Sequence, residues 1–374
     1  MELVPVEVLA RILSFLSPTH ALLLRGTSRL FRFAVESSTF AALCSADFVW
    51  VALPPRLQTA FVKSRFGKTE AIEWSKTDFV LNWIPPAVGA LESLTSLTAN
   101  NCNLAGSIPD EINNLVSLLS LDLAFNALSG YIPPLDRLSK LVSLRLESNE
   151  LFGPIPEHIS CLSNCRTICL SNNQLSGSLP SSLGAISTLE QFYACRNKIT
   201  GSIPIEFSKL MQLKELDLSK NRLSGTISPR LGKLGKLRAL FLDHNQLSGP
   251  VPRQLGNCTC LEDLVLSNNR LGGRIPKELG NLKNMVTLQL NNNVLSGALP
   301  CEIGELPCIA ELYLKGNILD PQIPEGFNRE SRVYRLLREE EFDGFGDGYS
   351  ERSSVCEENL SRPLSELSFS RQER

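Results

Sequence analysis

Few residues of this chain have the types and spacing that catalysis requires. The sequence holds three histidines, His20, His158 and His244, and the last of them directly follows Asp243. Neighbouring residues of a strand occupy different positions along it, so this pair does not by itself form a catalytic array. The chain has no Gly-x-Ser-x-Gly motif, no glycine-rich phosphate loop with lysine and no His-Glu-x-x-His motif. The sequence therefore predicts a protein that is not an enzyme.

Cysteine is the other residue type that could do chemistry. Of the 11 cysteines, Cys161, Cys165 and Cys169 follow one another at short intervals, and Cys258 is close to Cys260. A structural zinc site needs four ligands at short, matched spacings, and the chain offers only three histidines to complete one. We therefore expect no metal site and no cofactor, with the cysteines free in a reducing compartment.

The composition is that of an ordinary soluble protein. Its 374 residues are 43% apolar and 20% charged, with a net charge of −2, so nothing in the charge balance favours nucleic acid or a membrane surface as partner. No stretch of 18 uninterrupted apolar residues occurs. The first residues resemble a signal peptide poorly, because Glu2 and Glu7 replace the positive charges and Arg11 interrupts the apolar core. We expect a cytoplasmic or nuclear protein.

Most of the chain repeats itself with a period of 24 residues. The shared pattern is L-x-x-L-x-L-x-x-N-x-L-x-G-x-[IL]-P, with one step of 23 residues and an earlier copy that has Cys102 at the asparagine position. The aligned asparagines are Asn126, Asn149, Asn173, Asn197, Asn221, Asn245, Asn269, Asn293 and Asn317. A fixed period of this length is typical of a solenoid, in which each unit packs only against its neighbours.

Each part of the repeat has a physical role. The alternating leucines predict a short strand with its leucines inward, and the asparagine is expected to bond backbone groups at the bend, forming a buried ladder. The glycine permits close backbone approach, and the proline directs an extended segment before a short convex helix or turn. The shortened copy, YIPPLDRLSKL, predicts a tightened convex turn.

The pattern N-x-L-x-G-x-I-P resembles the plant-type leucine-rich repeat class, with about ten copies over residues 91–325. The resemblance implies an α/β solenoid, a curved horseshoe with a parallel sheet on its concave side and a smaller sheet beside it. It implies recognition and not catalysis.

The outward strand residues predict where a partner would bind. Aromatic and basic side chains on a rigid surface are the types that make interface hot spots. We expect the concave patch to contain Arg145, Tyr193, Arg196, Lys220, Phe241, Asp243 and His244. The alternative is that these are merely tolerated surface residues.

The start of the chain does not repeat and predicts a small α-helical domain. Its apolar residues follow the spacing of an amphipathic helix, and Pro5 lies in the first turn. Residues 4–31 resemble the F-box motif, with Val4 where leucine is usual. That family docks on the adaptor subunit of cullin-based ubiquitin ligases. The resemblance implies that the docking face and the domain's own core share Pro5, Val8, Leu9, Ile12, Leu13 and Leu16. The alternative is a helical cap that only seals the solenoid.

Four regions follow from these patterns. We expect an F-box-like motif in residues 1–45, a helical linker and cap in 46–90, the solenoid in 91–325, and a capping helix followed by a disordered tail in 326–374. The predicted function is that of a ligase substrate receptor, whose partners are the adaptor subunit and an unknown protein target. The alternative is a non-enzymatic scaffold or receptor-like recognition protein without a ligase role.

Overall fold

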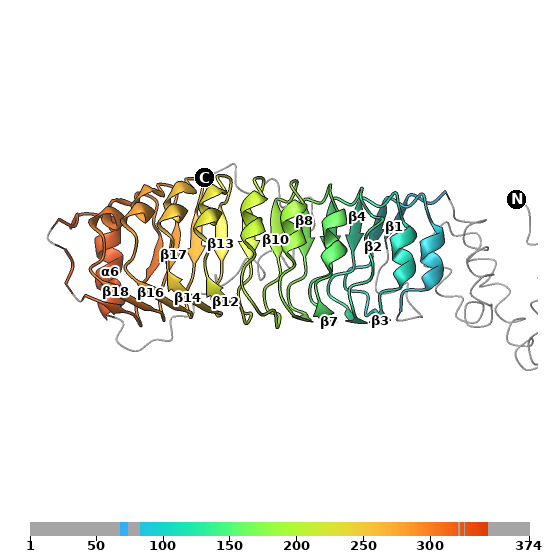
Figure 1. Ribbon diagram of the computed structural model, residues 1–374, viewed down its shortest axis with the longest axis horizontal. Coiled ribbons are helices and arrows are strands. Elements are labelled where there is room, and N and C mark those ends of the chain that lie inside the picture. The colour runs from blue at the N-terminus through green and yellow to red at the C-terminus, as the bar shows by residue number, and fades with distance from the viewer. Residues whose placement is uncertain (1–67, 74–82, 321, 325, 343–374) are drawn as a thin grey trace, which may run out of the picture.

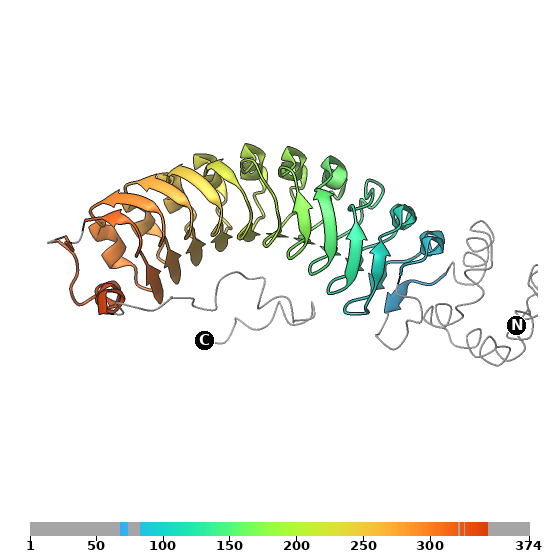
Figure 2. The same cartoon turned by 90° about the horizontal axis from the view of Figure 1, so that it is seen from below.

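The computed structural model describes residues 68–73, 83–320, 322–324 and 326–342. The predicted adaptor-docking residues, Pro5, Val8, Leu9, Ile12, Leu13 and Leu16, lie outside these residues, as does the tail beyond Phe342. The described chain forms an elongated, curved solenoid (Figures 1 and 2). We call one repeat, with its strand in the main sheet, a rung.

The main sheet is parallel and lines the concave side. In the described residues it has eleven strands, and leucines of successive strands stand opposite one another, as Leu216 and Leu240 do. The 24-residue period produces this register, because each rung returns the chain to the same point of the next strand. The strands are β1 (Ala71–Glu73), β2 (Ser96–Thr98), β4 (Ser120–Asp122), β6 (Ser143–Arg145), β8 (Thr167–Cys169), β10 (Gln191–Tyr193), β11 (Glu215–Asp217), β13 (Ala239–Phe241), β15 (Asp263–Val265), β17 (Thr287–Gln289) and β19 (Glu311–Tyr313).

A second parallel sheet runs along one side of the solenoid (Figure 1). It is divided into two groups, between which a single bridge joins Ser178 and Thr200. The first group comprises β3 (Ala105–Ser107), β5 (Ala127–Gly130), β7 (Glu150–Pro154) and β9 (Gln174–Ser176). The second comprises β12 (Ser224–Thr226), β14 (Gln246–Pro250), β16 (Arg270–Gly273), β18 (Val294–Gly297) and β20 (Ile318–Leu319).

Short 3-10 helices form the convex side, at the outer edge of the arc (Figure 2). Most begin directly after an extended proline, as η4 does after Pro180. They are η1 (Pro86–Ala90), η2 (Asp110–Asn114), η3 (Glu157–Cys161), η4 (Ser181–Ala185), η5 (Ile205–Lys209), η6 (Pro229–Lys233), η7 (Arg253–Asn257), η8 (Lys277–Asn281) and η9 (Cys301–Glu305).

The shortened rung has turns where its neighbours have a 3-10 helix. Polar side chains bridge the gap there: the Asn113 amide donates to Asp136 at 2.9 Å, and Arg137 donates to Asn114 at 2.7 Å. The loss of one residue is thus absorbed at the convex surface, and the strand register is unchanged.

The repeat leucines fill one continuous apolar core from Ile72 to Val333. The asparagine ladder runs beside it. Asn221, for example, accepts the N–H of Ile199 at 3.0 Å and donates to the carbonyl of Ala194 at 2.9 Å, both on the preceding rung. The same two bonds recur at Asn149, Asn173, Asn197, Asn245, Asn269 and Asn293. These observations confirm the predicted leucine-rich repeat horseshoe.

Both ends of the described solenoid carry additional structure. Strand β1 pairs with β2 and lies in the stretch assigned to the linker and cap, so the sheet begins before the first complete repeat. At the other end, helix α6 (Arg332–Phe342) packs on β19 and η9 and buries Val333.

Candidate protein-binding face

Two columns of side chains face outward from the main sheet. Each strand has three residues with a buried leucine, isoleucine or phenylalanine at its centre in most rungs, so the residues on either side point to the concave surface. On β11 these are Glu215 and Asp217, on either side of Leu216. Three of the predicted partner-binding residues, Arg145, Tyr193 and Phe241, lie in the second column, and none lies in the first. The residues of the first column also recur at 24-residue intervals, one position before each central leucine.

Six of the seven predicted partner-binding residues lie on three adjacent rungs. Tyr193 and Arg196 belong to the rung of β10, and Lys220 to the rung of β11. The rung of β13 contributes Phe241, Asp243 and His244. The seventh, Arg145, ends β6 and lies two rungs before β10. The structure thus places six of these residues together and one apart, which leaves their binding role a prediction.

Arg196, Lys220 and His244 occupy an unusual backbone position. Each directly precedes a ladder asparagine and has a positive φ, between 52° for Lys220 and 53° for the other two. This left-handed conformation costs an L-residue about 1–2 kcal/mol. Hydrogen bonds between rungs hold it, since the His244 N–H donates to the carbonyl of Ser267 at 3.0 Å. These half-buried side chains therefore project from a rigid turn at the rim of the face.

Arg145 is buried in a cluster of charges. Its guanidinium donates to Glu147, at 2.9 Å from Nε, and lies 3.9 Å from the carboxylate of Asp122. Burial raises the pKa of Glu147, against the lowering effect of Arg145. Burial also raises the pKa of the neighbouring Cys169 thiol well above its ordinary value, so this cysteine is a poor nucleophile.

Tyr193 is fixed by a neighbouring strand. Its hydroxyl donates to Glu215 at 2.6 Å, and Glu215 also accepts from Gln191 at 3.3 Å. Burial and the nearby Glu215 carboxylate raise the pKa of Tyr193 well above its ordinary value. The phenol therefore stays neutral and acts as a hydrogen-bond donor.

Two buried aspartates lie on the next rungs. Asp217 accepts from the N–H and the hydroxyl of Ser219 at 3.0 and 2.7 Å, and burial raises its pKa to about 7. Asp243 lies 2.8 Å from Nδ1 of His244. Within the described chain, no hydrogen bond joins the His244 imidazole to the side chain of a serine, threonine or cysteine. The pair therefore has the geometry of a structural contact and lacks a nucleophile to activate.

A small apolar cluster lies beside these charges. Ala239 and Phe241 on β13 pack with Val265 on β15, separately from the main core. Phe241 thus belongs to a local apolar site on an otherwise polar sheet, which is the composition of an interface centre.

The edge of the main sheet carries ion pairs whose residues were not among the predicted site residues. Glu190 lies 3.5 Å from Arg166 and bonds Lys214 on its other side, and Arg238 lies 4.0 Å from Glu262. These residues share one repeat position at 24-residue intervals, which is the signal that could have identified them. Surface pairs of this kind contribute little stability, about 0–1 kcal/mol each.

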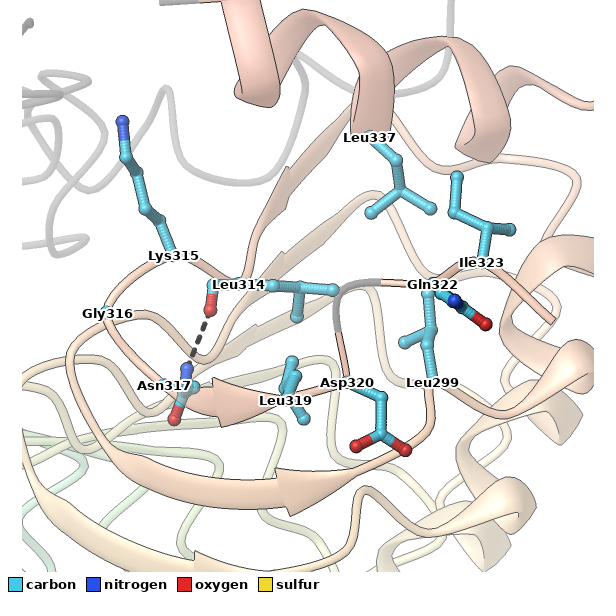
Figure 3. A pocket seen from close by; sticks show the side chains of 10 residues that line it. All are labelled: Leu299, Leu314, Lys315, Gly316, Asn317, Leu319, Asp320, Gln322, Ile323 and Leu337. Carbon is cyan, nitrogen blue, oxygen red and sulfur yellow. Dashed lines mark hydrogen bonds between the residues drawn. The ribbon is translucent and has the colours of Figure 1, made fainter. Parts of the chain in front are cut away.

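A hollow of about 290 Å³ lies at the C-terminal end of the described solenoid, between the last rung and α6 (Figure 3). Leu299, Leu314 and Leu319 line it together with Leu337 of α6, and Asn317 donates to the Leu314 carbonyl at 2.7 Å. The hollow has a mixed lining, since Lys315, Asp320 and Gln322 border it beside the leucines, and none of the predicted site residues in the described chain lines it.

The described residues show how the cysteines are placed. Cys161 is exposed, Cys165 and Cys258 are buried, and all three are free. Among these described parts, no three His, Cys, Asp or Glu side chains come together in a way that could hold a metal ion. No helix in the same residues is both long and apolar enough to cross a membrane.

Comparison with known families identifies both parts of the chain. The F-box domain family matches residues 1–42. The leucine-rich repeat family matches residues 93–115, 164–186, 212–234, 236–258 and 260–282.

Known proteins share the repeats. An inactive leucine-rich repeat receptor-like serine/threonine-protein kinase of Arabidopsis thaliana is 37% identical over 102 residues, which are 27% of this chain and 16% of the kinase. The crystal structure of a TDR receptor aligns with a TM-score of 0.60 and 30% identity, over 69% of this chain and 51% of the receptor. A plant ice-binding protein aligns with a TM-score of 0.56 and 32% identity, over 65% and 79% of the two chains. This chain thus spans about half of that receptor and a small part of the kinase.

The repeat, the two sheets and the asparagine ladder define a leucine-rich repeat protein of the plant type. With the match at its start, the chain is a leucine-rich repeat protein that carries an N-terminal F-box domain. Both domains are binding modules that typically have no catalytic activity, so their combination suggests a protein-recognition module.

Proposed function

We propose that this chain is the substrate receptor of a cullin-based ubiquitin ligase and has no catalytic activity of its own. The F-box domain would dock on the adaptor subunit through Pro5, Val8, Leu9, Ile12, Leu13 and Leu16. The observation that carries the proposal is the F-box match at residues 1–42, on the same chain as a rigid recognition solenoid. The protein would act by raising the concentration of its target near the conjugating enzyme.

The concave face would bind the target. Its rungs β10, β11 and β13 combine half-buried basic side chains at the rim, Arg196, Lys220 and His244, with the apolar cluster around Phe241. A binding site built on a stack of hydrogen-bonded rungs is preorganised, which reduces the entropy lost on binding. Because this face lies on the solenoid, target binding is expected to be separable from adaptor binding.

Adaptor binding is the decisive test. Purified full-length chain should bind the recombinant adaptor subunit in isothermal titration calorimetry, and the double variant Leu9→Asp, Leu13→Asp should lose at least roughly tenfold in affinity, since it places charges in an apolar interface. A double variant on the solenoid, Arg196→Ala, His244→Ala, serves as control and should bind the adaptor like wild type. A wild-type chain that fails to bind, or a double variant that binds equally well, would leave the scaffold role as the better assignment.

A scaffold or receptor-like recognition role without a ligase is the second candidate. It is favoured by the identity of the repeat relatives, which are a receptor-like kinase and a receptor structure. In that case the concave face would still bind a protein partner, and the N-terminal helices would only seal the solenoid.

A further inference from the structure

The second sheet presents a row of basic side chains to solvent. The residue after each ladder asparagine points outward there, as Gln246 does on β14, where the next residue, Leu247, is buried. Along consecutive rungs this position is occupied by Gln174, Lys198, Arg222, Gln246 and Arg270. A further exposed cation, Arg274, lies just beyond β16.

The acidic residue of this column is Glu150, which begins β7 one rung before Gln174. The six following segments of the second sheet contain no aspartate or glutamate: residues 174–180, 198–204, 222–229, 246–252, 270–276 and 294–300. In the described residues none of the four cations forms an ion pair, whereas Arg166, Lys214 and Arg238 at the main-sheet edge are each paired with a glutamate. An unpaired basic row on a chain with a net charge of −2 is a local feature and does not reflect the overall charge.

Contacts with neighbouring rungs restrain two of the four cations. Lys198 donates to Gln174 at 3.1 Å, and the side chain of Arg274 lies across Gly297 of the following rung, 3.3 Å from the position a Cβ would take. Neighbouring parallel strands are about 4.8 Å apart, so the distance from the Lys198 rung to the Arg270 rung is roughly 14 Å. Outward hydroxyl groups of Ser224 and Ser248 lie along the same strands and add hydrogen-bonding capacity.

An exposed aromatic pair continues this sheet toward its N-terminal end. The rings of Tyr131 and Phe152 meet edge to face with centroids 4.9 Å apart, and their exposed fractions are 62% and 43%. Other rungs have mostly serine or threonine at the position of Phe152. Large aromatic residues exposed on a rigid surface are the types that anchor protein partners.

We propose that the second sheet binds an extended acidic segment of a protein partner. The segment's aspartates and glutamates would pair with Lys198, Arg222, Arg270 and Arg274, and an apolar side chain at one end would pack on Tyr131 and Phe152. The footprint covers five rung spacings, roughly 24 Å, which an extended chain of about seven or eight residues spans at 3.3 Å per residue. Four cations and one aromatic pair suit such a peptide better than a nucleic acid, which requires a longer basic track.

Peptide binding to the full-length chain tests this proposal. The probe is a fluorescein-labelled eight-residue peptide with one phenylalanine followed by serine, glycine and five acidic residues, measured by fluorescence polarisation at low salt. The triple variant Lys198→Glu, Arg222→Glu, Arg270→Glu should weaken binding by roughly tenfold or more. The control triple variant Arg230→Glu, Lys233→Glu, Lys236→Glu changes the net charge equally on the exposed convex side and should change affinity less than about twofold.

The aromatic anchor has its own test. Phe152→Ser should weaken the probe several-fold but leave unchanged a second peptide in which alanine replaces the phenylalanine. Equal weakening by both triple variants would overturn the proposal, because it would reflect net charge alone. Wild type that binds a single-stranded RNA oligomer more tightly than the peptide, or binds a peptide of residues 343–358 more tightly than the probe, would overturn the assignment to a protein partner. Loss of adaptor binding in the separate F-box experiment would not affect this result.

Discussion

At the scale of single residues, the concave face is distinguished by polar groups that the fold buries. Asp217 has no exposed surface, and its carboxylate is held by the backbone and side chain of Ser219. Two hydrogen bonds stabilise the charged form, but burial outweighs them and Asp243 nearby adds repulsion, so the pKa of Asp217 rises to about 7. A site of this kind makes stability depend on pH near neutrality.

The Asp217→Asn variant tests this dependence. Because the folded-state pKa of about 7 exceeds the ordinary value of 3.8, the folded chain binds more protons between these pH values. The contribution of Asp217 to the free energy of unfolding therefore falls as pH rises from about 4 to about 7 and stays low above that. Asparagine is neutral and keeps the acceptor, so the variant should equal wild type near pH 4 and exceed it at pH 8 by up to about 4 kcal/mol.

Urea unfolding followed by circular dichroism at several pH values measures this difference. Asp136→Asn, on the exposed convex surface, is the matched control for the loss of one negative charge, and any pH dependence that both variants share is to be assigned to that loss. A pH-independent difference for Asp217→Asn would show that Asp217 is ionised in the folded chain.

At the scale of elements, the convex side depends on glycines at which neighbouring 3-10 helices meet. A Cβ added at Gly184 of η4 would lie 2.5 Å from the carbonyl oxygen of Glu206 on η5, and Gly232 and Gly256 meet the next rung equally closely. The obstacle is backbone, which cannot move away without separating the rungs. Close contact and not backbone angle therefore explains this glycine position.

Gly184→Ala should destabilise the chain by about 1–3 kcal/mol, because the added methyl group forces η4 and η5 apart. Thermal unfolding provides the measurement, with Gly235→Ala as control. A Cβ at Gly235 would meet nothing within 4 Å, so that variant should unfold at or slightly above the wild-type temperature. Equal destabilisation by the two variants would show that the close contact at Gly184 is not the cause.

The elements that sequence predicted well are those that the repeat specifies in every copy. The leucine spacing, ladder asparagines and prolines gave the strands, the ladder and the convex turns, because each copy reinforces the others. Strand β1 was not predicted, since Ala71–Glu73 lacks the leucine pattern and is recruited by pairing with β2. The interruption of the second sheet at Thr200 was also missed, because it depends on backbone geometry and not on residue type.

The candidate site was predictable only in outline. The period placed Tyr193, Phe241 and their neighbours on the concave side, but the burial of Arg145 against Glu147 depends on how neighbouring rungs pack side by side. The ion pairs around Glu190 differ, because their residues share one repeat position at 24-residue intervals. Repeat position gives the face on which a residue lies, whereas its partners come from the adjacent rungs.

At the scale of the whole molecule, the solenoid is a one-dimensional stack. Each rung contacts only the rungs beside it, so stability is approximately a sum over neighbouring pairs and the ends are the weakest points. At the C-terminal end, helix α6 covers the last rung with Val333 fully buried and Leu336 and Leu337 packed against the core. A hollow remains beside Leu337, between this cap and the last rung.

The Val333→Asp variant should therefore loosen the C-terminal rungs selectively. A buried, unpaired carboxylate costs at least about 3 kcal/mol, which favours release of α6 and exposes the last rung to water. Hydrogen exchange followed by mass spectrometry should show protection of the rungs at 287–319 falling by roughly 100-fold, while the rungs at 191–245 keep theirs. Arg335→Asp, an exposed change on the same helix, should leave both regions unchanged. A uniform loss of protection along the chain would mean that the solenoid unfolds as a single cooperative unit, and that its binding faces share one stability.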